Sequence, residues 1–420
     1  MITHRWLKNT DYRTLLRNYS SLSLVQLSNY ILPLITLPYL TRVLGTSHFG
    51  LVMMAQATMV YLTLITDYGF NLSATKQIAT VQTNTKEVSK QLSTVMTIKS
   101  GLLLMSAMTL YLLIQWVPLF NAHKILFFAS FLIVVGNTFL PTFLFQGLEK
   151  MGTISILNLI AKLGFTGLIF LLITEKPDYM WVHALWGCSY IVVDLMAFGM
   201  ILTRFKLHWV TPTLQSIQHT LVGSFEYFLS RVAIALYLNA NVIIIGIVLT
   251  PTAAGLYSGA EKLLFAITTF YAPLIETVYP YVSRTKNKAF IQKILIVTAS
   301  LNTIICTIVF FIAPILIPFL LGSAFAPAST YFKWLLIIAV LHLPTSMIGY
   351  PILGALGYQK TANRSVIYGA IIHIILLLLC YSFLKTPIHF IWIMIASQSV
   401  IFLIRIQKLY QIRNIISNPN

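Results

Sequence analysis

Several polar or charged side chains of this 420-residue chain lie inside stretches that are otherwise apolar, and eight of them are candidates for a binding site. A charge at the centre of a lipid bilayer costs on the order of 3 kcal/mol, so such groups normally pair with one another or face water. Where they face water they can contact a substrate or a coupling ion, because cations hold anions and carboxylates hold cations or protons. These candidate substrate-binding residues are Arg42, Gln56, Asp67, Glu226, Arg231, Asn241, Glu261 and Lys262.

The first of these side chains lie in residues 25–76. This stretch contains two apolar segments, one on each side of Thr46-Ser47-His48. Each arm is long enough to cross a bilayer, so the stretch predicts a membrane hairpin. On the second arm, at about 100° per residue, four polar side chains fall within roughly 80° of one another: Gln56, Thr63, Asp67 and Asn71. On the first arm one face carries Gln26, Asn29, Pro33 and Thr36. Two such stripes indicate a shared wet surface, or else hydrogen bonds between packed helices.

The second half of the chain repeats this pattern with more charge. Around Arg231 one helical face carries Glu226, Ser230, Tyr237 and Asn241. In the next span, within about 100°, lie Tyr257, Glu261, Thr268, Glu276 and Tyr279, and Lys262 is offset by one position. Pro273 should kink that span. The residues are expected to face a cavity, the alternative being an ion pair of Glu261 with Arg231 that holds the helices in register.

Other polar residues inside apolar runs have simpler explanations. Arg42 is two residues from the outer end of its span, where snorkelling to the surface explains it as well as substrate contact does. Lys99, Lys162 and Lys333 can snorkel in the same way. His342 and His373 are expected to be hydrogen-bonded packing residues.

Composition identifies the class of protein that must position these groups. Hydrophobic residues make up 58% of the chain and charged residues 9%, with a mean hydropathy of +0.83, which excludes a water-exposed globular surface. The chain is therefore an all-α polytopic membrane protein. The net charge of +18 comes from basic residues scattered between apolar spans, so nucleic acid is excluded as a partner. The three cysteines lie in apolar stretches without metal-ligand spacing.

About twelve segments have spanning length. Their limits are 22–44, 48–71, 93–116, 124–148, 153–174, 181–203, 221–249, 254–282, 292–320, 330–353, 364–384 and 388–404. Nineteen of the 28 Lys and Arg residues fall on one side of these spans and three on the other. By the positive-inside rule both termini face the cytoplasm, and the polar, basic N-terminus is expected to be retained.

A short internal repeat suggests two similar halves. Sliding the chain by 205 positions aligns Gly50-Leu51 with Gly255-Leu256, and Gln56 with Glu261. An even number of spans per half gives parallel repeats, so we expect two six-helix lobes around a central cavity. The expected segments are a cytoplasmic N-terminal segment 1–21, an N-lobe 22–203, a linker 204–220, a C-lobe 221–404 and a cytoplasmic tail 405–420.

No connection between spans exceeds about twenty residues, so none can form a soluble catalytic domain. The sequence contains no Ser/His/Asp set, Walker motif or Gly-rich phosphate loop. We therefore expect no enzyme activity, no cofactor and no bound metal.

The run VQLSNYILPLITLPYLTRVLG, followed by HFG and TDYGFNLSATKQIA, resembles the opening of bacterial O-antigen and polysaccharide flippases of the Wzx type. FLSRVAIALYLNANVIIIG and AGLYSGAEKL are also similar to that family, which belongs to the multidrug/oligosaccharidyl-lipid/polysaccharide exporter superfamily. The resemblance covers most of the chain.

This resemblance implies a two-lobed exporter in the bacterial inner membrane that moves undecaprenyl-pyrophosphate-linked oligosaccharide repeat units to the outer leaflet. Implied partners are the lipid-linked oligosaccharide, membrane lipids, a coupling ion (a proton or another ion), a polysaccharide polymerase and a chain-length regulator. The chain departs from a strongly cationic lumen, because Glu226, Glu261 and Glu276 accompany Arg231 and Lys262.

Two alternatives remain. A cation-coupled drug antiporter of the same superfamily would share the fold and the intramembrane carboxylates. A membrane-embedded glycan polymerase or ligase would usually need a large outer loop, whereas the outer loops expected here have about four to ten residues.

Overall fold

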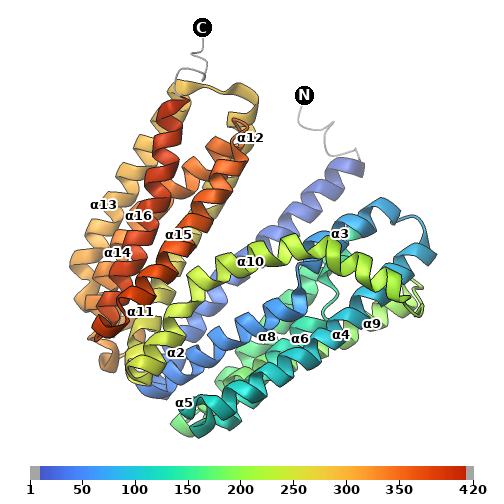
Figure 1. The fold of residues 1–420 in the computed structure, drawn as a ribbon, viewed down its shortest axis with the longest axis horizontal. Helices are drawn as coiled ribbons and strands as arrows, with labels where there is room; N and C mark the ends of the chain where they lie inside the picture. Colours follow the sequence, from blue (N-terminus) through green and yellow to red (C-terminus); the bar gives the residue numbers. More distant parts are fainter. Residues whose placement is uncertain (1–9, 413–420) are drawn as a thin grey trace. The chain divides into compact units, whose positions relative to one another are not determined.

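The computed structural model describes residues 10–412, with side chains from residue 32 onward except at 230, 233, 234 and 236–238. Every regular element in this part of the chain is a helix (Figure 1). The expected N-terminal segment 1–21 and tail 405–420 lie partly outside the described residues, as do the side chains of Gln26, Asn29, Ser230 and Tyr237.

The chain packs as two compact units. Unit 1 contains the chain up to Tyr39 together with Ala55–Val232, and unit 2 contains Leu40–Met54 and the chain from Ala233 onward. The units are defined by packing, whereas the expected lobes 22–203 and 221–404 are defined by counting spans, so the lobe limits stay a prediction. The packing boundaries fall inside helices, because residues 40–54 pack against the second half of the chain.

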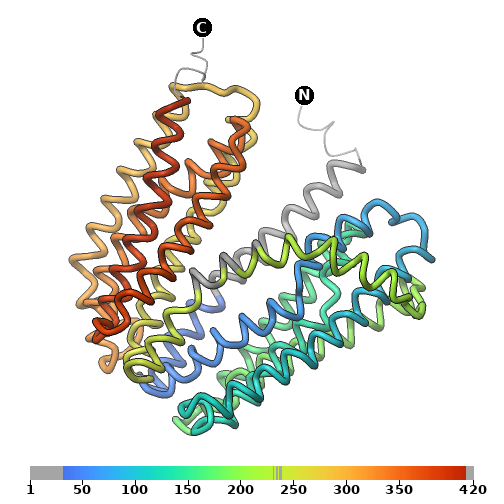
Figure 2. Tube along the Cα trace, in the orientation of Figure 1, coloured from blue at the N-terminus to red at the C-terminus, as the bar shows by residue number. Residues whose placement is uncertain are grey.

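The predicted N-terminal hairpin is present. Helix α2 (Thr10–Asp67) is interrupted at Gly45, whose φ of 69° and ψ of 179° are not helical. Glycine has no Cβ and adopts this positive φ without strain, so the chain can turn back there (Figure 2). The expected turn at 46–48 is thus confirmed to within a residue.

The second arm of the hairpin is longer than expected and is broken. Tyr68 and Gly69 follow α2 with positive φ values of 43° and 80°, and α3 (Phe70–Val81) then continues. Most of the expected loop 72–92 is therefore helical, since the next helix begins at Thr85.

The remaining helices of unit 1 include a close crossing. A Cβ on Gly187 would lie 2.4 Å from the backbone carbon of Leu132, so only glycine allows this approach. The elements are α4 (Thr85–Trp116), α5 (Pro118–Ala122), α6 (Lys124–Phe139), α7 (Thr142–Gly147), α8 (Met151–Leu172), η1 (Lys176–Trp181), α9 (Val182–Thr203) and α10 (Leu214–Val248), whose last residues belong to unit 2.

Unit 2 contains two further helix breaks. The kink predicted at Pro273 is confirmed as a break at Tyr271, and a π-helical turn with a non-helical Gly349 follows α14. The elements are α11 (Pro251–Phe270), α12 (Ala272–Thr285), α13 (Lys288–Leu321), η2 (Ser323–Phe325), α14 (Ala328–Met347), η3 (Ile348–Gly354), α15 (Gln359–Leu379), η4 (Tyr381–Phe383) and α16 (Pro387–Gln411).

The repeated glycines of the sequence meet in unit 2. A Cβ on Gly50 would lie 1.8 Å from the carbonyl oxygen of Pro251, and one on Gly255 would lie 1.9 Å from that of Thr46. Each glycine therefore lets the backbone of the other helix approach. The G-L repeat is a packing requirement of two helices that touch each other.

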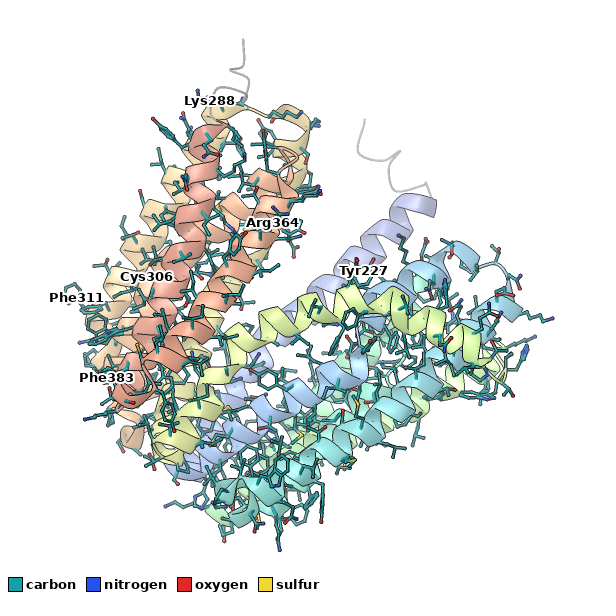
Figure 3. The ribbon with its side chains drawn as sticks, viewed as in Figure 1. Tyr227, Lys288, Cys306, Phe311, Arg364 and Phe383 are labelled. Carbon is teal, nitrogen blue, oxygen red and sulfur yellow. The ribbon has the colours of Figure 1, made fainter. Side chains whose placement is uncertain are left out.

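The surfaces of both units carry many large apolar side chains. Phe311 and Phe383, each 73% exposed, belong to the unit 2 elements α13 and η4 (Figure 3). Within the described part, ten helical stretches are long and apolar enough to cross a membrane. One of them, Leu32–Val81, includes both arms of the hairpin, and Asn239–Val248, the end of α10, is a shorter apolar helix. The count of about twelve spans stays a prediction.

Candidate functional site

The break after α2 places a carboxylate inside the helix bundle of unit 1. The aromatic ring of Tyr68 stacks on Phe228 of α10 with centroids 4.7 Å apart. A Cβ on Gly69 would lie 2.7 Å from the Cβ of Tyr227, so α10 presses directly on the break. Discontinuous helices are a common way for transporters to expose polar groups at membrane depth.

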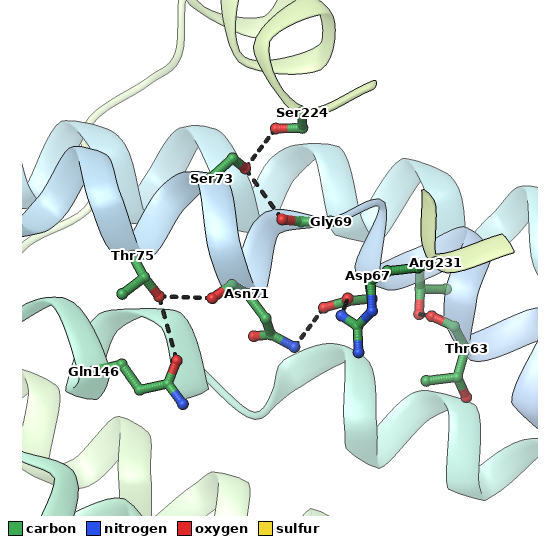
Figure 4. A network of polar contacts seen from close by, with 10 residues as sticks. Thr63, Asp67, Gly69, Asn71, Ser73, Thr75, Gln146, Ser224 and Arg231 are labelled. Carbon is green, nitrogen blue, oxygen red and sulfur yellow. Dashed lines mark hydrogen bonds and ion pairs between the residues drawn. The ribbon is translucent and has the colours of Figure 1, made fainter. Parts of the chain in front are cut away.

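Asp67, the last residue of α2, forms an ion pair with Arg231 of α10 (Figure 4). The Asn71 amide donates a hydrogen bond to the other Asp67 oxygen at 2.5 Å. The Asp67 side chain is 10% exposed and the Arg231 side chain 41% exposed. Asp67 is therefore the buried member of the pair, and the Arg231 side chain is partly exposed.

Hydrogen bonds around the break hold it to its neighbours. The hydroxyls of Ser73 and Ser224 lie 2.7 Å apart, joining α3 to α10, and Thr75 contacts Gln146 of α7 at 3.4 Å (Figure 4). The position of Asp67 is thus fixed from two sides.

Two more buried charges lie in unit 1. Lys99 of α4 is 1% exposed, with its Nζ 5.7 Å from the centroid of the Phe143 ring, so the expectation that it snorkels is wrong. Its charge interacts with those of Asp67 and Asp194 of α9. Asp194 is 4% exposed, and neither of its carboxylate oxygens has a hydrogen-bond partner among the described residues.

Unit 2 carries a chain of hydrogen bonds that includes Glu261. The Tyr257 hydroxyl lies 2.8 Å from Glu261 Oε1, and Asn241 Nδ2 lies 3.5 Å from that hydroxyl. Asn241 Oδ1 is 3.2 Å from His373 Nε2, and His373 Nδ1 is 3.3 Å from the Ser397 hydroxyl. The chain joins α11, α10, α15 and α16. His373 is hydrogen-bonded and buried, as expected.

Unit 2 contains a buried arginine, Arg405, beside the helix break at η3. Arg405 donates from Nε to the Ser365 hydroxyl at 2.8 Å, from Nη1 to the Thr345 carbonyl at 2.7 Å and from Nη2 to the Ala362 carbonyl at 3.1 Å. It is 7% exposed and lies within α16, although the sequence placed it at the start of a cytoplasmic tail.

The eight candidate residues are divided between the units. Asp67, Arg231, Gln56 and Glu226 belong to unit 1, and Arg42, Asn241, Glu261 and Lys262 belong to unit 2. The ion-pair partner found for Arg231 is Asp67, where the sequence suggested Glu261 as the structural alternative. Arg42 Nη2 donates to the Phe319 carbonyl at 2.6 Å, near the end of α13. Glu226 is exposed, whereas Gln56, Glu261 and Lys262 are partly buried.

Sequence reasoning missed Asp194 and the role of Arg405. Asp194 could have been found by the rule that found Asp67, because it is a lone acid in the apolar run YIVVDLMAFG. Arg405 gave no local signal, since a basic residue at the end of an apolar run is typical of a membrane-surface anchor.

The model of a family described as "Polysaccharide biosynthesis protein" matches residues 15–286, more than half of the chain. The chain belongs to this family. Two of its relatives carry the name "Putative O-antigen transporter". The relative in Escherichia coli (strain K12) is 28% identical over 88% of this chain and 90% of its own length. The relative in Shigella dysenteriae is 26% identical over 91% and 95%.

Solved structures support the fold of this family member. The inward closed conformation of the lipid II flippase MurJ matches with a TM-score of 0.71 and 17% identity, over 94% of this chain and 87% of that chain. An inward-facing multidrug resistance MATE transporter of the MOP superfamily matches with a TM-score of 0.67 and 14% identity, over 94% and 99%. These structures confirm the all-α polytopic membrane fold, and the family model and the two O-antigen transporter relatives confirm the resemblance to the O-antigen and polysaccharide family.

Proposed function

We propose that this protein is a flippase for lipid-linked repeat units of O-antigen or a related surface polysaccharide. The repeat unit, carried on undecaprenyl pyrophosphate, moves from the cytoplasmic to the outer leaflet of the bacterial inner membrane. The protein acts as a transporter and forms no covalent bond in the cargo.

The observation that carries this proposal is the match to two proteins named as O-antigen transporters along about nine tenths of their length and of this chain. Membership of the polysaccharide biosynthesis family supports the same pathway.

The physical task fits the polar groups in unit 1. A pyrophosphate cannot cross about 30 Å of hydrocarbon without polar contacts, whereas the polyprenyl tail can remain in lipid. Arg231 lies on a long apolar helix, its side chain is partly exposed, and its guanidinium is paired with one carboxylate. Phosphate oxygens could compete with Asp67 for its planar donors by charge-assisted hydrogen bonds. We therefore assign the head-group contact to Arg231.

The other candidate residues have different roles in this proposal. Gln56, Glu226 and Lys262 are the partly or fully exposed polar residues that would contact sugar hydroxyls or phosphate. Asn241 and Glu261 belong to the hydrogen-bonded chain of unit 2, and Arg42 caps α13. In this proposal a coupling ion supplies the energy for transport. Both termini of the protein face the cytoplasm. A polysaccharide polymerase and a chain-length regulator then act on the delivered repeat units.

Deleting the protein tests this function. Surface display of one polysaccharide should be lost, while its lipid-linked repeat units accumulate at the cytoplasmic leaflet and isolated membranes still synthesise them. Wild-type protein should restore display. The variant Arg231→Ala should not, whereas the exposed control Arg204→Ala should.

A different result would point to a different class of protein. Membranes from the deletion strain that fail to make the repeat unit would indicate an enzyme. Normal display together with lost dye efflux would indicate the drug antiporter.

A further inference from the structure

The ammonium group of Lys99 is buried in unit 1 with its donors unused by the described residues. Lys99 lies on α4 and is 1% exposed. Among the residues that the structure describes it forms neither a hydrogen bond nor an ion pair, and its Nζ faces the Phe143 ring at 5.7 Å. An ammonium group has three donors, and a buried charge is normally paired. Lys99 is therefore a cation that can accept a carboxylate as a new partner.

The register of α4 against α2 places Lys99 near Asp67. The Ser106 hydroxyl of α4 donates to the Leu62 carbonyl of α2 at 3.2 Å, so the two helices are adjacent there. Lys99 lies about two turns from Ser106 and therefore on the same face of α4. Because the chain reverses between α3 and α4, the two helices are antiparallel. From that contact Lys99 lies about 10.5 Å along α4, and Asp67 lies about 7.5 Å along α2 in the same direction.

A second set of contacts leads from Lys99 to the same carboxylate. The carbonyl of Phe143, whose ring faces Lys99, is 3.3 Å from the Thr75 hydroxyl. That hydroxyl is 2.8 Å from the Asn71 carbonyl, and the Asn71 amide donates to Asp67 (Figure 4). The charge of Lys99 accordingly interacts with that of Asp67. Both sets of contacts place this cation beside the carboxylate that holds Arg231.

Binding of cargo creates a need for such a cation. One Asp67 oxygen pairs with Arg231 and the other accepts from the Asn71 amide, so both oxygens have partners before cargo arrives. In the proposed function, phosphate oxygens displace Asp67 from the Arg231 guanidinium. The Asp67 side chain is 10% exposed, so little water reaches it to replace the lost donor. An unpaired buried carboxylate is unfavourable and would oppose the binding of cargo.

We propose that Lys99 receives the Asp67 carboxylate when the pyrophosphate of the cargo takes Arg231. Lys99 is then a positioning residue, because it contacts Asp67 and not the cargo. The lysine stem is flexible, so its ammonium reaches Asp67 by a change of rotamer. The exchange replaces one ion pair by two, Arg231 with phosphate and Lys99 with Asp67, and it transfers no proton. This inference deepens the proposed flippase function and rests on it.

Asp194 of α9 supplies the counter-charge for Lys99 before cargo binds. Its carboxylate is 4% exposed, and its charge interacts with that of Lys99. Both of its oxygens lack a hydrogen-bond partner among the described residues, so Lys99 is not bonded to it. Lys99 can therefore move toward Asp67 without breaking a hydrogen bond. Asp194 and Asp67 thus compete for one cation.

Binding of undecaprenyl pyrophosphate to the purified full-length protein, in nanodiscs of neutral phosphatidylcholine, tests this exchange. Lys99→Met should weaken binding by about tenfold, or about 1.4 kcal/mol, because Asp67 then has no cation to receive it. Lys99→Arg keeps the charge and should retain most of the affinity. Lys162→Met, which removes another lysine from an apolar helix of unit 1, is the matched control and should bind like the wild type.

A double-mutant cycle separates the exchange from a structural role of Lys99. Asp67→Asn should bind the probe more tightly than the wild type, since no carboxylate then holds Arg231. Adding Lys99→Met to Asp67→Asn should have no further effect, because no carboxylate has to be received. An equal loss of affinity from Lys99→Met in both backgrounds would make Lys99 structural and overturn the proposal.

Asp194→Asn provides a test that does not depend on the folding of Lys99→Met. It removes the competing carboxylate, so Lys99 can pair with Asp67 more closely and Arg231 is released more readily. Binding of the probe should therefore tighten. Weaker or unchanged binding in a variant with a normal unfolding temperature would contradict the exchange.

Display of the polysaccharide distinguishes a failure of this inference from a failure of the proposed function. If deletion abolishes display but Lys99→Met binds the probe as tightly as the wild type, the exchange is wrong and the flippase function stands. If the wild type does not bind the probe, the head-group contact of Arg231 and the exchange both fail. If deletion leaves display intact, the flippase function fails, and the exchange fails with it.

Discussion

Two arginines of this protein lie beside broken helices, and their surroundings differ. Arg231 in unit 1 is paired with the Asp67 carboxylate and is 41% exposed at its side chain. Arg405 in unit 2 is 7% exposed, and its three described hydrogen bonds go to two carbonyls and a hydroxyl. The guanidinium of Arg231 is bound by a carboxylate, which an anionic cargo could replace. The guanidinium of Arg405 is bound by neutral hydrogen-bond acceptors.

The difference indicates different roles. Thr345 lies in the last turn of α14, a helix end that attracts cations, and its carbonyl oxygen accepts from the Ile348 N–H as well as from Arg405. Arg405 therefore closes the helix end at the η3 break, and a Cβ on Gly349 would lie 2.6 Å from its Nη1. The Arg231 side chain, in contrast, is partly exposed. We infer that Arg405 stabilises unit 2, whereas Arg231 contacts cargo.

The largest effect is expected from Arg405→Met. It removes the three hydrogen bonds that the guanidinium donates to the Ser365 hydroxyl and to the Thr345 and Ala362 carbonyls, and a hydrogen bond from a charged group contributes about 1.5–3 kcal/mol. Protein abundance in membranes and the thermal unfolding temperature in detergent should both fall. Arg405→Lys should recover only part of the loss, because lysine keeps the charge but not the planar fork. The exposed Arg364→Met is the control and should leave both measurements unchanged. Normal stability of Arg405→Met would end the distinction between the two arginines.

Removing Arg231 from its pair with Asp67 is expected to lower stability less than Arg405→Met does, but to abolish export completely. Arg231→Ala leaves the buried Asp67 carboxylate without its ion-pair partner. Breaking a fully buried ion pair costs about 3–5 kcal/mol of stability. Because Arg231 is partly exposed, the variant should lose only part of that amount. Arg231→Ala combined with Asp67→Ala should restore abundance.

The double variant decides the role of Arg231. It should remain unable to export, because the cation that meets the cargo is missing. Arg231→Lys should keep partial export. Recovery of surface polysaccharide in the double variant would make the pair purely structural, like the contacts of Arg405.

Much of the fold could be predicted because its signals are local. Each of these features is identified by residues that are close together in the sequence: the apolar runs, the turn near Gly45 and the break near Pro273. The Tyr257–Glu261 contact also follows from their four-residue spacing on one helical face. The break at Tyr68–Gly69 could not be predicted, because it depends on α10 packing against Gly69.

The partners of the charges could not be predicted, because they are distant in sequence. Asp67 and Arg231 are 164 residues apart, and the acceptors of Arg405 lie 40 to 60 residues before it. A helical face identifies a polar stripe but not the helix it meets. The pairing of charges therefore required the packing of the units.

The smallest effect is expected for a third arginine, Arg42, which tests how far the comparison extends. Its guanidinium is exposed and donates to the Phe319 carbonyl in the last turn of α13, before Gly322. Arg42→Ala should therefore lower the unfolding temperature only slightly, since an exposed helix-end contact contributes about 0.3–1 kcal/mol, and export should persist. Lys385→Ala, which removes an exposed cation elsewhere in unit 2, is the matched control. If Arg42→Ala loses export at normal abundance while the control does not, Arg42 is a second cargo-contacting cation. Exposure would then predict function better than the identity of the partner, because Arg42 is exposed like Arg231 but is bonded to a carbonyl like Arg405.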